Sequence, residues 1–305
     1  TCCVLFLLAP CLYFHSAAGL NLRPIIGVLA QHFYKGPTHI PASYVKFLES
    51  AGARVVPIFV DKEYDYYERL FNSTNGVLFP GGGVSLQESG YSRAAAIFLR
   101  LAIQANDNGT HYPVWGTCLG MEQLVYLQAN QSIMKLCRGQ DIATTLNFSQ
   151  DYRRRGIFQE LPHALERALT KENITYNYHQ WCITPENFTK YGLDTFYDVL
   201  STSQDADGLT FISTLQAKRY PIYGSQWHPE KAAFEWVDAP KHRHIPHSEN
   251  AVKAMQYVAN FFVEQARKNQ HHFKSEEQEA KALIYNYPAT YMGANASTVQ
   301  EYIFQ

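Results

Sequence analysis

The stretch of sequence that decides the fold is PVWGTCLGMEQL, residues 113–124. An apolar run leads into Cys118, and apolar residues at helical spacing follow it. This pattern predicts a strand that ends near Gly116 and a helix that begins directly after Cys118. Because Gly116 and Gly120 carry no side chain, strand, turn and helix can approach closely, as in a nucleophile elbow.

Two interpretations of Cys118 stay open on this stretch alone. A cysteine at the start of a helix feels the positive end of the helix dipole, which we expect to lower its thiol pKa and make it a nucleophile. The alternative is a small buried residue in a tight joint between strand and helix. Gly-x-Cys-x-Gly is a short pattern, so the choice depends on the rest of the chain.

Strand and helix patterns alternate on both sides of this stretch. We expect strands within 24–30, 54–60, 76–83 and 112–118, and helices within 44–51, 64–71, 94–105 and after Cys118. The strands are almost continuously apolar, which is typical of a parallel sheet with helices on both faces. The predicted fold class is therefore α/β, with a mainly parallel central sheet flanked by helices.

The pattern changes between residues 138 and 227. Strand-like runs at 196–203, 209–217 and 221–227 indicate extra antiparallel strands or an extended sheet edge. A last long helix is expected after Ser248, a suitable N-cap, and the segment from Lys274 is expected to pack back on the domain. Without a repeat or a linker, residues 19–305 are interpreted as a single domain.

The N-terminal residues 1–18 read as a secretory signal peptide, without an initiator Met or a basic start. They are too short an apolar run for a membrane span. Asn-x-Ser/Thr occurs seven times, whereas 15 Asn and 33 Ser and Thr in 305 residues predict about 1.6 by chance. The expected glycosylation sites are Asn72, Asn108, Asn130, Asn147, Asn173, Asn187 and Asn295.

The remaining composition excludes several classes of protein. A net charge of −1 without a basic run gives no case for nucleic acid as a partner. Outside the signal, the cysteines are Cys118, Cys137 and Cys182, so at most one internal disulfide is possible, and Cys118 is the candidate free thiol. There is no Cys-x-x-Cys zinc pattern. His242, His244 and His247 are interpreted as a solvated loop, so neither metal nor cofactor is predicted.

Two further motifs supply what a cysteine nucleophile needs. In YGSQWHPEK, residues 223–231, His228 is a candidate base and Glu230 could orient its imidazole. In FPGGG, residues 79–83, glycines after a strand expose backbone N–H groups, which with the N–H of Leu119 could form an oxyanion hole. A structural histidine and a flexible glycine loop are the respective alternatives.

The three motifs in this order resemble the class I glutamine-amidotransferase-like hydrolases. RPIIGVLAQ, YNYHQWCIT and WHPEKAAFEW are, in addition, similar to the γ-glutamyl hydrolase family. The resemblance implies cysteine-dependent hydrolysis of γ-glutamyl bonds in folate and antifolate poly-γ-glutamates through a thioester. It also implies a lysosomal and secreted homodimer whose partner is a small-molecule substrate.

The resemblance assigns roles to individual residues. It implies Cys118 as nucleophile, His228 as general acid/base and Glu230 as the third catalytic position. Oxyanion or substrate binding is implied for Gly82, Gly83, Leu119, Glu122 and His179. A glutamine-hydrolysing ammonia supplier and a non-catalytic secreted glycoprotein remain the alternative functions. Intact Cys118 and His228 argue against the second, and the absence of a synthetase domain in this sequence argues against the first.

Overall fold

The computed structural model describes residues 19–33, 36–237, 240, 242–293 and 295–305. The predicted signal peptide, residues 1–18, lies outside this part of the chain. Within the described residues, no helix is both long enough and apolar enough to cross a bilayer.

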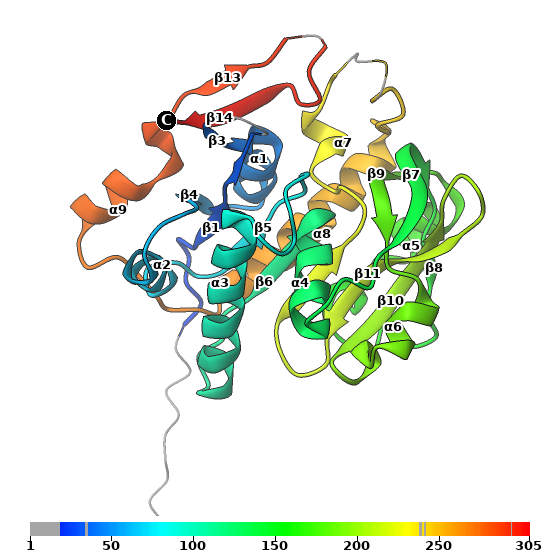
Figure 1. The fold of residues 1–305 in the computed structure, drawn as a ribbon, viewed down its shortest axis with the longest axis horizontal. Helices are drawn as coiled ribbons and strands as arrows, with labels where there is room; N and C mark the ends of the chain where they lie inside the picture. Colours follow the sequence, from blue (N-terminus) through cyan, green and yellow to red (C-terminus); the bar gives the residue numbers. More distant parts are fainter. Residues whose placement is uncertain (1–18, 34–35, 238–239, 241, 294) are drawn as a thin grey trace, which may run out of the picture.

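An eight-stranded sheet forms the centre of the molecule (Figure 1). Its first five strands in spatial order run parallel, and the remaining three continue it in antiparallel fashion. The order is β4 (Arg54–Ile58), β1 (Ile25–Leu29), β5 (Val77–Phe79), β6 (Val114–Thr117), β12 (Ile222–Ser225), β11 (Thr210–Ala217), β10 (Tyr197–Gln204) and β8 (Asn147–Phe148). The predicted fold class is confirmed.

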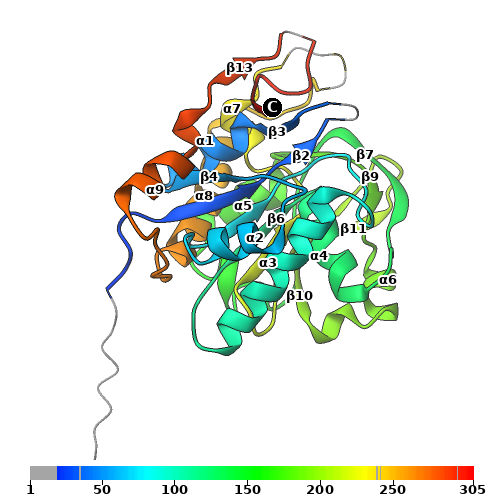
Figure 2. The same cartoon turned by 60° about the vertical axis from the view of Figure 1, so that its left-hand side comes forward.

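Helices cover both faces of this sheet, as Figure 2 shows from the side. On one face lie α1 (Ala42–Ser50), α5 (His163–Lys171), α7 (Lys231–Phe234) and α8 (Glu249–Ala266). On the other lie α2 (Tyr64–Phe71), α3 (Gly90–Asp107), α4 (Leu119–Ala129) and α6 (Pro185–Lys190). The near-continuous apolar strands bury side chains against both layers, which is why they lack polar alternation.

The predicted start of the last long helix is confirmed. The Ser248 side chain accepts a hydrogen bond from the backbone N–H of Ala251, and this N-cap begins α8. The segment from Lys274 also packs back on the domain, as expected. It contains α9 (Glu276–Ala282), β13 (Ala289–Tyr291) and β14 (Gln300–Phe304), and β14 pairs with β3 (Thr38–Pro41), which in turn pairs with β2 (Gln31–His32).

The structure corrects the prediction for residues 221–227. β10 and β11 are antiparallel additions, as expected, but β12 lies inside the main sheet and pairs in parallel with β6. The run of apolar residues identifies a buried strand without identifying its neighbour. A separate antiparallel ribbon of β7 (Lys135–Thr144) and β9 (Thr175–Cys182), not predicted from the sequence, lies beside the end of β12.

Candidate active site

Cys118 occupies the sharp turn between β6 and α4. Its backbone has φ 51° and ψ −109°, a conformation that residues other than glycine rarely adopt. A Cβ on Gly120 would lie 2.0 Å from the carbonyl oxygen of Phe79, and one on Gly116 would lie 2.5 Å from Gly120. Only glycine fits at these two positions, so the sequence motif is explained by close packing around the predicted elbow.

His228 and Glu230 form a buried pair beside this turn. Their Nδ1 and Oε1 atoms are 2.7 Å apart, and the side chains are 7% and 1% exposed. Because an ionised carboxylate only accepts hydrogen bonds, Nδ1 carries the proton of the neutral imidazole. Nε2 has no hydrogen-bond partner among the described residues, so it can take a proton from a nucleophile. The backbone N–H of His228 donates to the Tyr176 carbonyl and fixes the residue against β9.

Gly81 lies where the cysteine and the histidine meet. A Cβ built on Gly81 would be 2.7 Å from Cε1 of His228 and 3.2 Å from Cβ of Cys118. Residues 118 and 228 therefore adjoin the same point of the glycine loop. The elbow cysteine and the imidazole come together in the tertiary structure, although 110 positions separate them in the sequence.

Of the N–H groups that the sequence suggested for the glycine loop, the N–H of Gly82 is available to a substrate and the N–H of Gly81 is not. The N–H of Gly81 donates to the Tyr44 hydroxyl at 2.8 Å, so it is engaged and does not face a reacting oxygen. Nε2 of Gln31 donates to the Gly81 carbonyl at 2.7 Å. The peptide bond between Gly81 and Gly82 is trans, so the N–H of Gly82 points opposite to the Gly81 carbonyl. Because Gln31 binds that carbonyl, the N–H of Gly82 points away from Gln31. Gly82 has no backbone acceptor among the described residues.

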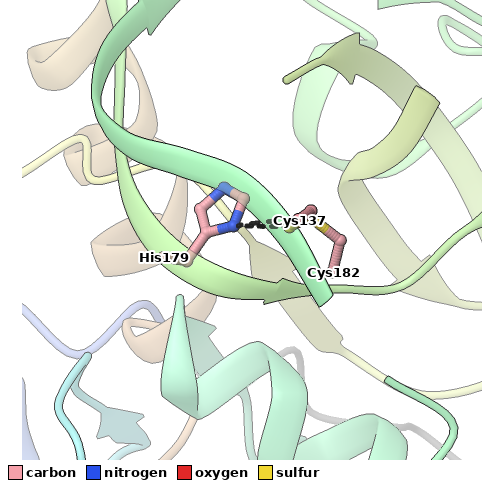
Figure 3. Close-up of side chains that lie close together, drawn as sticks. All are labelled: Cys137, His179 and Cys182. Carbon is pink, nitrogen blue, oxygen red and sulfur yellow. Dashed lines mark hydrogen bonds between the residues drawn. A yellow bond between two sulfur atoms is a disulfide. The ribbon is translucent and has the colours of Figure 1, made fainter. Parts of the chain in front are cut away.

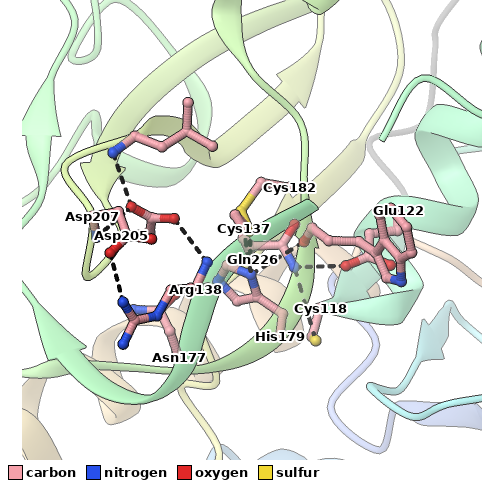
Figure 4. Close-up of a disulfide and its surroundings, with 12 residues drawn as sticks. Cys118, Glu122, Cys137, Arg138, Asn177, His179, Cys182, Asp205, Asp207 and Gln226 are labelled. Atoms are coloured by element: carbon pink, nitrogen blue, oxygen red, sulfur yellow. Dashed lines mark hydrogen bonds and ion pairs between the residues drawn. A yellow bond between two sulfur atoms is a disulfide. The ribbon is translucent and has the colours of Figure 1, made fainter. Parts of the chain in front are cut away.

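Gln226 connects Cys118 to Glu122, as Figure 4 shows. Its Nε2 lies 2.9 Å from Oε1 of Glu122 and 3.8 Å from Sγ of Cys118. All three side chains are buried. Burial raises the pKa of Glu122 to about 7, while the hydrogen bond from Gln226 acts in the opposite direction. Glu122 therefore changes charge near neutral pH at about one helical turn from the thiol.

The expected low pKa of the Cys118 thiol is wrong for this chain without substrate. Burial raises the pKa of Cys118 well above its usual value, and the carboxylates of Glu122 and Glu230 raise it further. The N–H of Leu119 at the helix start lowers this pKa, in the expected direction, but its effect is smaller than that of burial. Glu122 lies one turn along the same helix, whereas burial and the charge of Glu230 come from segments that folding brings to the thiol. Deprotonation of Cys118 thus requires a base.

We expect the Glu122→Gln substitution to lower the apparent pKa of the Cys118 thiol, because it removes a negative charge that opposes thiolate formation. Alkylation of Cys118 by iodoacetamide, followed by mass spectrometry across a pH series, should become about 3- to 10-fold faster near pH 8. Glu249→Gln, at an exposed position on α8, is the matched control. An alkylation profile identical to that of the unsubstituted chain would show that Glu122 does not act on the thiol.

His179 lies against a disulfide, as Figure 3 shows. Cys137 and Cys182 are joined, with Cα atoms 6.0 Å apart, and Cys118 is the free cysteine of the described chain. Nδ1 of His179 is 3.6 Å from Sγ of Cys137. The side chains of Cys137, His179 and Cys182 are close enough together to hold a metal ion. A metal would need cysteine thiolates, however, and the two sulfurs are bonded to each other in the disulfide. The disulfide instead ties β7 to β9, whose Tyr178 carbonyl accepts from the Cys118 thiol at 3.9 Å.

The electrostatics of His179 limit its possible role. Burial, and then the nearby charge of His228, lower the pKa of His179 to about 3. The imidazole is thus neutral from mildly acidic to neutral pH. It can donate or accept a hydrogen bond near the site, but it supplies no positive charge.

The prediction of a solvated histidine loop at 242–247 is wrong for His242. This side chain is buried, stacks on the ring of Tyr178 at 4.3 Å and contacts the Tyr176 hydroxyl. His244 is exposed, as expected, and pairs with Asp141 on β7. The loop therefore packs against the β7–β9 ribbon, a contact that its polar, Pro-flanked sequence does not reveal.

The predicted glycosylation sites lie at the surface with one exception. Six are exposed: Asn72, Asn108, Asn130, Asn147, Asn173 and Asn295. Asn187 is partly buried, and its Nδ2 donates to the Ile133 carbonyl at 2.8 Å.

Sequence reasoning missed four side chains of the site. These are Gln31, Tyr44, Gln226 and Lys231, all of them buried. Each lies next to a recognised element, Gln31 after the first strand and Gln226 and Lys231 within the His-Pro-Glu stretch. A polar residue inside an otherwise apolar strand or helix is the signal that could have indicated them.

Comparison with solved structures identifies the class of fold. The fold is similar to the glutaminase domain of Trypanosoma brucei CTPS, with a TM-score of 0.52 at 12% identity, over 81% of this chain and 95% of that one. The fold is therefore that of the class I glutamine-amidotransferase-like proteins, and on it an elbow cysteine lies near a His–Glu pair and a glycine loop.

The particular family follows from sequence similarity. The profile of the peptidase C26 family matches residues 24–230. The chain is 48% identical to the γ-glutamyl hydrolase of Bos taurus and 46% identical to that of Homo sapiens, in each case over 92% of this chain and 90% of the relative. The chain therefore belongs to the peptidase C26 family of γ-glutamyl hydrolases and is a hydrolase of the cysteine-peptidase type.

Proposed function

We propose that this protein hydrolyses γ-glutamyl bonds in folate and antifolate poly-γ-glutamates through a thioester on Cys118. The observation that carries the proposal is the meeting of Cys118 and His228 at Gly81. The similarity to relatives named γ-glutamyl hydrolase supports the bond type.

The reaction begins with transfer of the Cys118 proton to Nε2 of His228, while Glu230 stabilises the imidazolium through Nδ1–H. The thiolate adds to the γ-carbonyl carbon of a glutamyl residue. The N–H groups of Gly82 and Leu119 stabilise the oxyanion, and Gly83 continues the same loop. His228 then returns its proton to the leaving amine, and the carbon–nitrogen bond breaks. Water, deprotonated by His228, hydrolyses the thioester and regenerates the thiol.

The expected selectivity is for γ-linked over α-linked glutamyl chains. A γ-linked amide carbon lies at the end of two methylenes, so a slender chain can deliver it to an elbow cysteine, whereas an α-linked carbonyl has a side chain beside it. We expect kcat/KM on pteroyl-α-triglutamate to be at least about 100-fold below that on pteroyl-γ-triglutamate. Comparable values would reject the proposal and indicate a general cysteine peptidase, and efficient ammonia release from free glutamine would indicate a glutaminase.

We propose further that the chain enters the secretory pathway, is lysosomal and secreted, and forms a homodimer. The seven sequons and the family resemblance support this. In protein secreted from cultured animal cells, peptide N-glycosidase should increase mobility on a denaturing gel. Mass spectrometry should find Asn187 the least occupied site, because its amide is partly buried. An unchanged mobility would contradict the secretory assignment, and full occupancy at Asn187 would contradict the argument from burial.

A further inference from the structure

Two consecutive peptide groups of the glycine loop are held by buried side chains from three different elements. The carbonyl of Pro80 accepts a hydrogen bond from the Tyr91 hydroxyl at 2.7 Å, and the N–H of Gly81 donates to the Tyr44 hydroxyl at 2.8 Å. The carbonyl of Gly81 accepts from Nε2 of Gln31 at 2.7 Å. These side chains belong to α3, α1 and β2, and each is at most 3% exposed. The first peptide group, between Pro80 and Gly81, is therefore fixed at both ends.

The second peptide group, between Gly81 and Gly82, is fixed at one end. Gln31 holds its carbonyl, whereas its N–H has no backbone acceptor among the described residues. Gly82 is exposed, so this N–H is open to a ligand. Glycine lies on both sides of the peptide group and tolerates the dihedral angles that a rotation by about 180° requires. If its carbonyl had no partner, this peptide group could therefore turn its N–H away from the site.

The Gln31 amide lies close to this peptide group. A backbone carbonyl only accepts hydrogen bonds, so the atom that faces the Gly81 carbonyl is Nε2, the donor of the amide. A Cβ built on Gly82 would lie 1.8 Å from Oε1 of Gln31, so this approach requires glycine at position 82. A Cβ built on Gly81 would lie 3.2 Å from Cβ of Cys118. The peptide group that Gln31 holds therefore adjoins the candidate nucleophile.

We infer that Gln31 is a positioning residue for the oxyanion hole. By binding the Gly81 carbonyl, it points the N–H of Gly82 to where the γ-carbonyl oxygen of a glutamyl substrate becomes an oxyanion. The inference rests on the proposed γ-glutamyl hydrolysis. A donor that is oriented before the substrate arrives does not have to reorganise during the reaction. Because the oxyanion forms only along the reaction, loss of Gln31 should lower kcat and change KM little.

The test compares two substitutions in the full-length protein that differ in the hydrogen bond they can make. Leucine makes none, so Gln31→Leu should lower kcat on pteroyl-γ-diglutamate about 10-fold and leave KM within about 3-fold. Glutamate has the shape of glutamine, but its ionised carboxylate only accepts, so it attracts the N–H of Gly82 and repels the Gly81 carbonyl. Near pH 8, Gln31→Glu should therefore turn the peptide group and lower kcat by about 100-fold or more.

The pH dependence of Gln31→Glu separates positioning from a structural role. A protonated carboxyl group can donate its O–H to the Gly81 carbonyl, as the glutamine amide does, and burial favours the protonated form. The kcat of this variant, divided by that of the unsubstituted protein at the same pH, should therefore recover to within about 10-fold near pH 5. The division removes the titration of Tyr44, Cys118 and His228, which adjoin Gly81 in both proteins.

Crystal structures of Gln31→Glu near pH 8 and near pH 5 give a readout that does not depend on activity. The N–H of Gly82 should face the substituted side chain near pH 8 and point away from it near pH 5. Gln270→Glu is the matched control, because Nε2 of the exposed Gln270 donates to the Gly19 carbonyl at 2.8 Å. This control variant should have the activity of the unsubstituted protein at both pH values.

The inference is overturned if the N–H of Gly82 keeps its orientation in both crystal structures, or if the two Gln31 variants lose the same factor at every pH. A folded Gln31→Leu variant with full kcat overturns it whatever the stability of Gln31→Glu. So does a Gln31→Leu variant in which alkylation of Cys118 slows as much as kcat, since the substitution would then act through the nucleophile. An unsubstituted protein inert on pteroyl-γ-diglutamate would refute the proposed function, while the crystal structures test the peptide orientation independently.

Discussion

We expect Cys118→Ala to reduce kcat/KM on a γ-linked diglutamate by at least about 1,000-fold. The thiol is the group that forms the covalent bond, and no other described cysteine is free to replace it. The substitution removes only a sulfur atom and leaves the backbone of the elbow unchanged. Steady-state hydrolysis, with products separated by length, measures the effect.

The stability of the Cys118→Ala variant provides the control. Because alanine fits wherever cysteine fits, the midpoint of urea unfolding should change little. Binding of an uncleaved substrate should likewise persist, since the glycine loop is intact. More than a few per cent of the original activity in the purified variant would exclude Cys118 as the nucleophile.

The second large effect is expected for His228→Asn. The buried thiol has a raised pKa, so it depends on Nε2 of His228 to remove its proton, and the leaving amine depends on the same atom to receive one. Activity should fall by about the same factor as in Cys118→Ala. Alkylation of Cys118 near neutral pH should also slow down, which a loss of substrate binding alone would not cause.

The double variant shows whether Cys118 and His228 act in the same catalytic step or contribute to activity independently. Residues that act as one unit show losses that do not add, so Cys118→Ala with His228→Asn should be about as inactive as either single variant. A double variant whose loss approaches the product of the two single losses would show that the residues do not share a step. His271→Asn, at a histidine that packs against Phe71 and Tyr112 at the end of α2, should retain activity and serves as the histidine control.

The sequence alone determined the parallel sheet, the elbow at Cys118 and the capped start of the last helix. These features depend on short-range patterns: continuous apolar strands, helical spacing, and glycines at a turn where only they fit. The His-Pro-Glu stretch was recognisable for the same reason. Its order after the Gly-x-Cys-x-Gly motif was enough to predict the class of chemistry.

The tertiary structure alone decided how these parts act on one another. The parallel pairing of β12, the pairing of Cys137 with Cys182 and the burial of Lys231 involve contacts between distant segments. The direction of the Cys118 pKa shift also depends on the tertiary structure. Its helix start is local and lowers the pKa, but burial of the thiol within the folded chain raises the pKa more. Desolvation and charge depend on what surrounds a group in space, which no local pattern specifies.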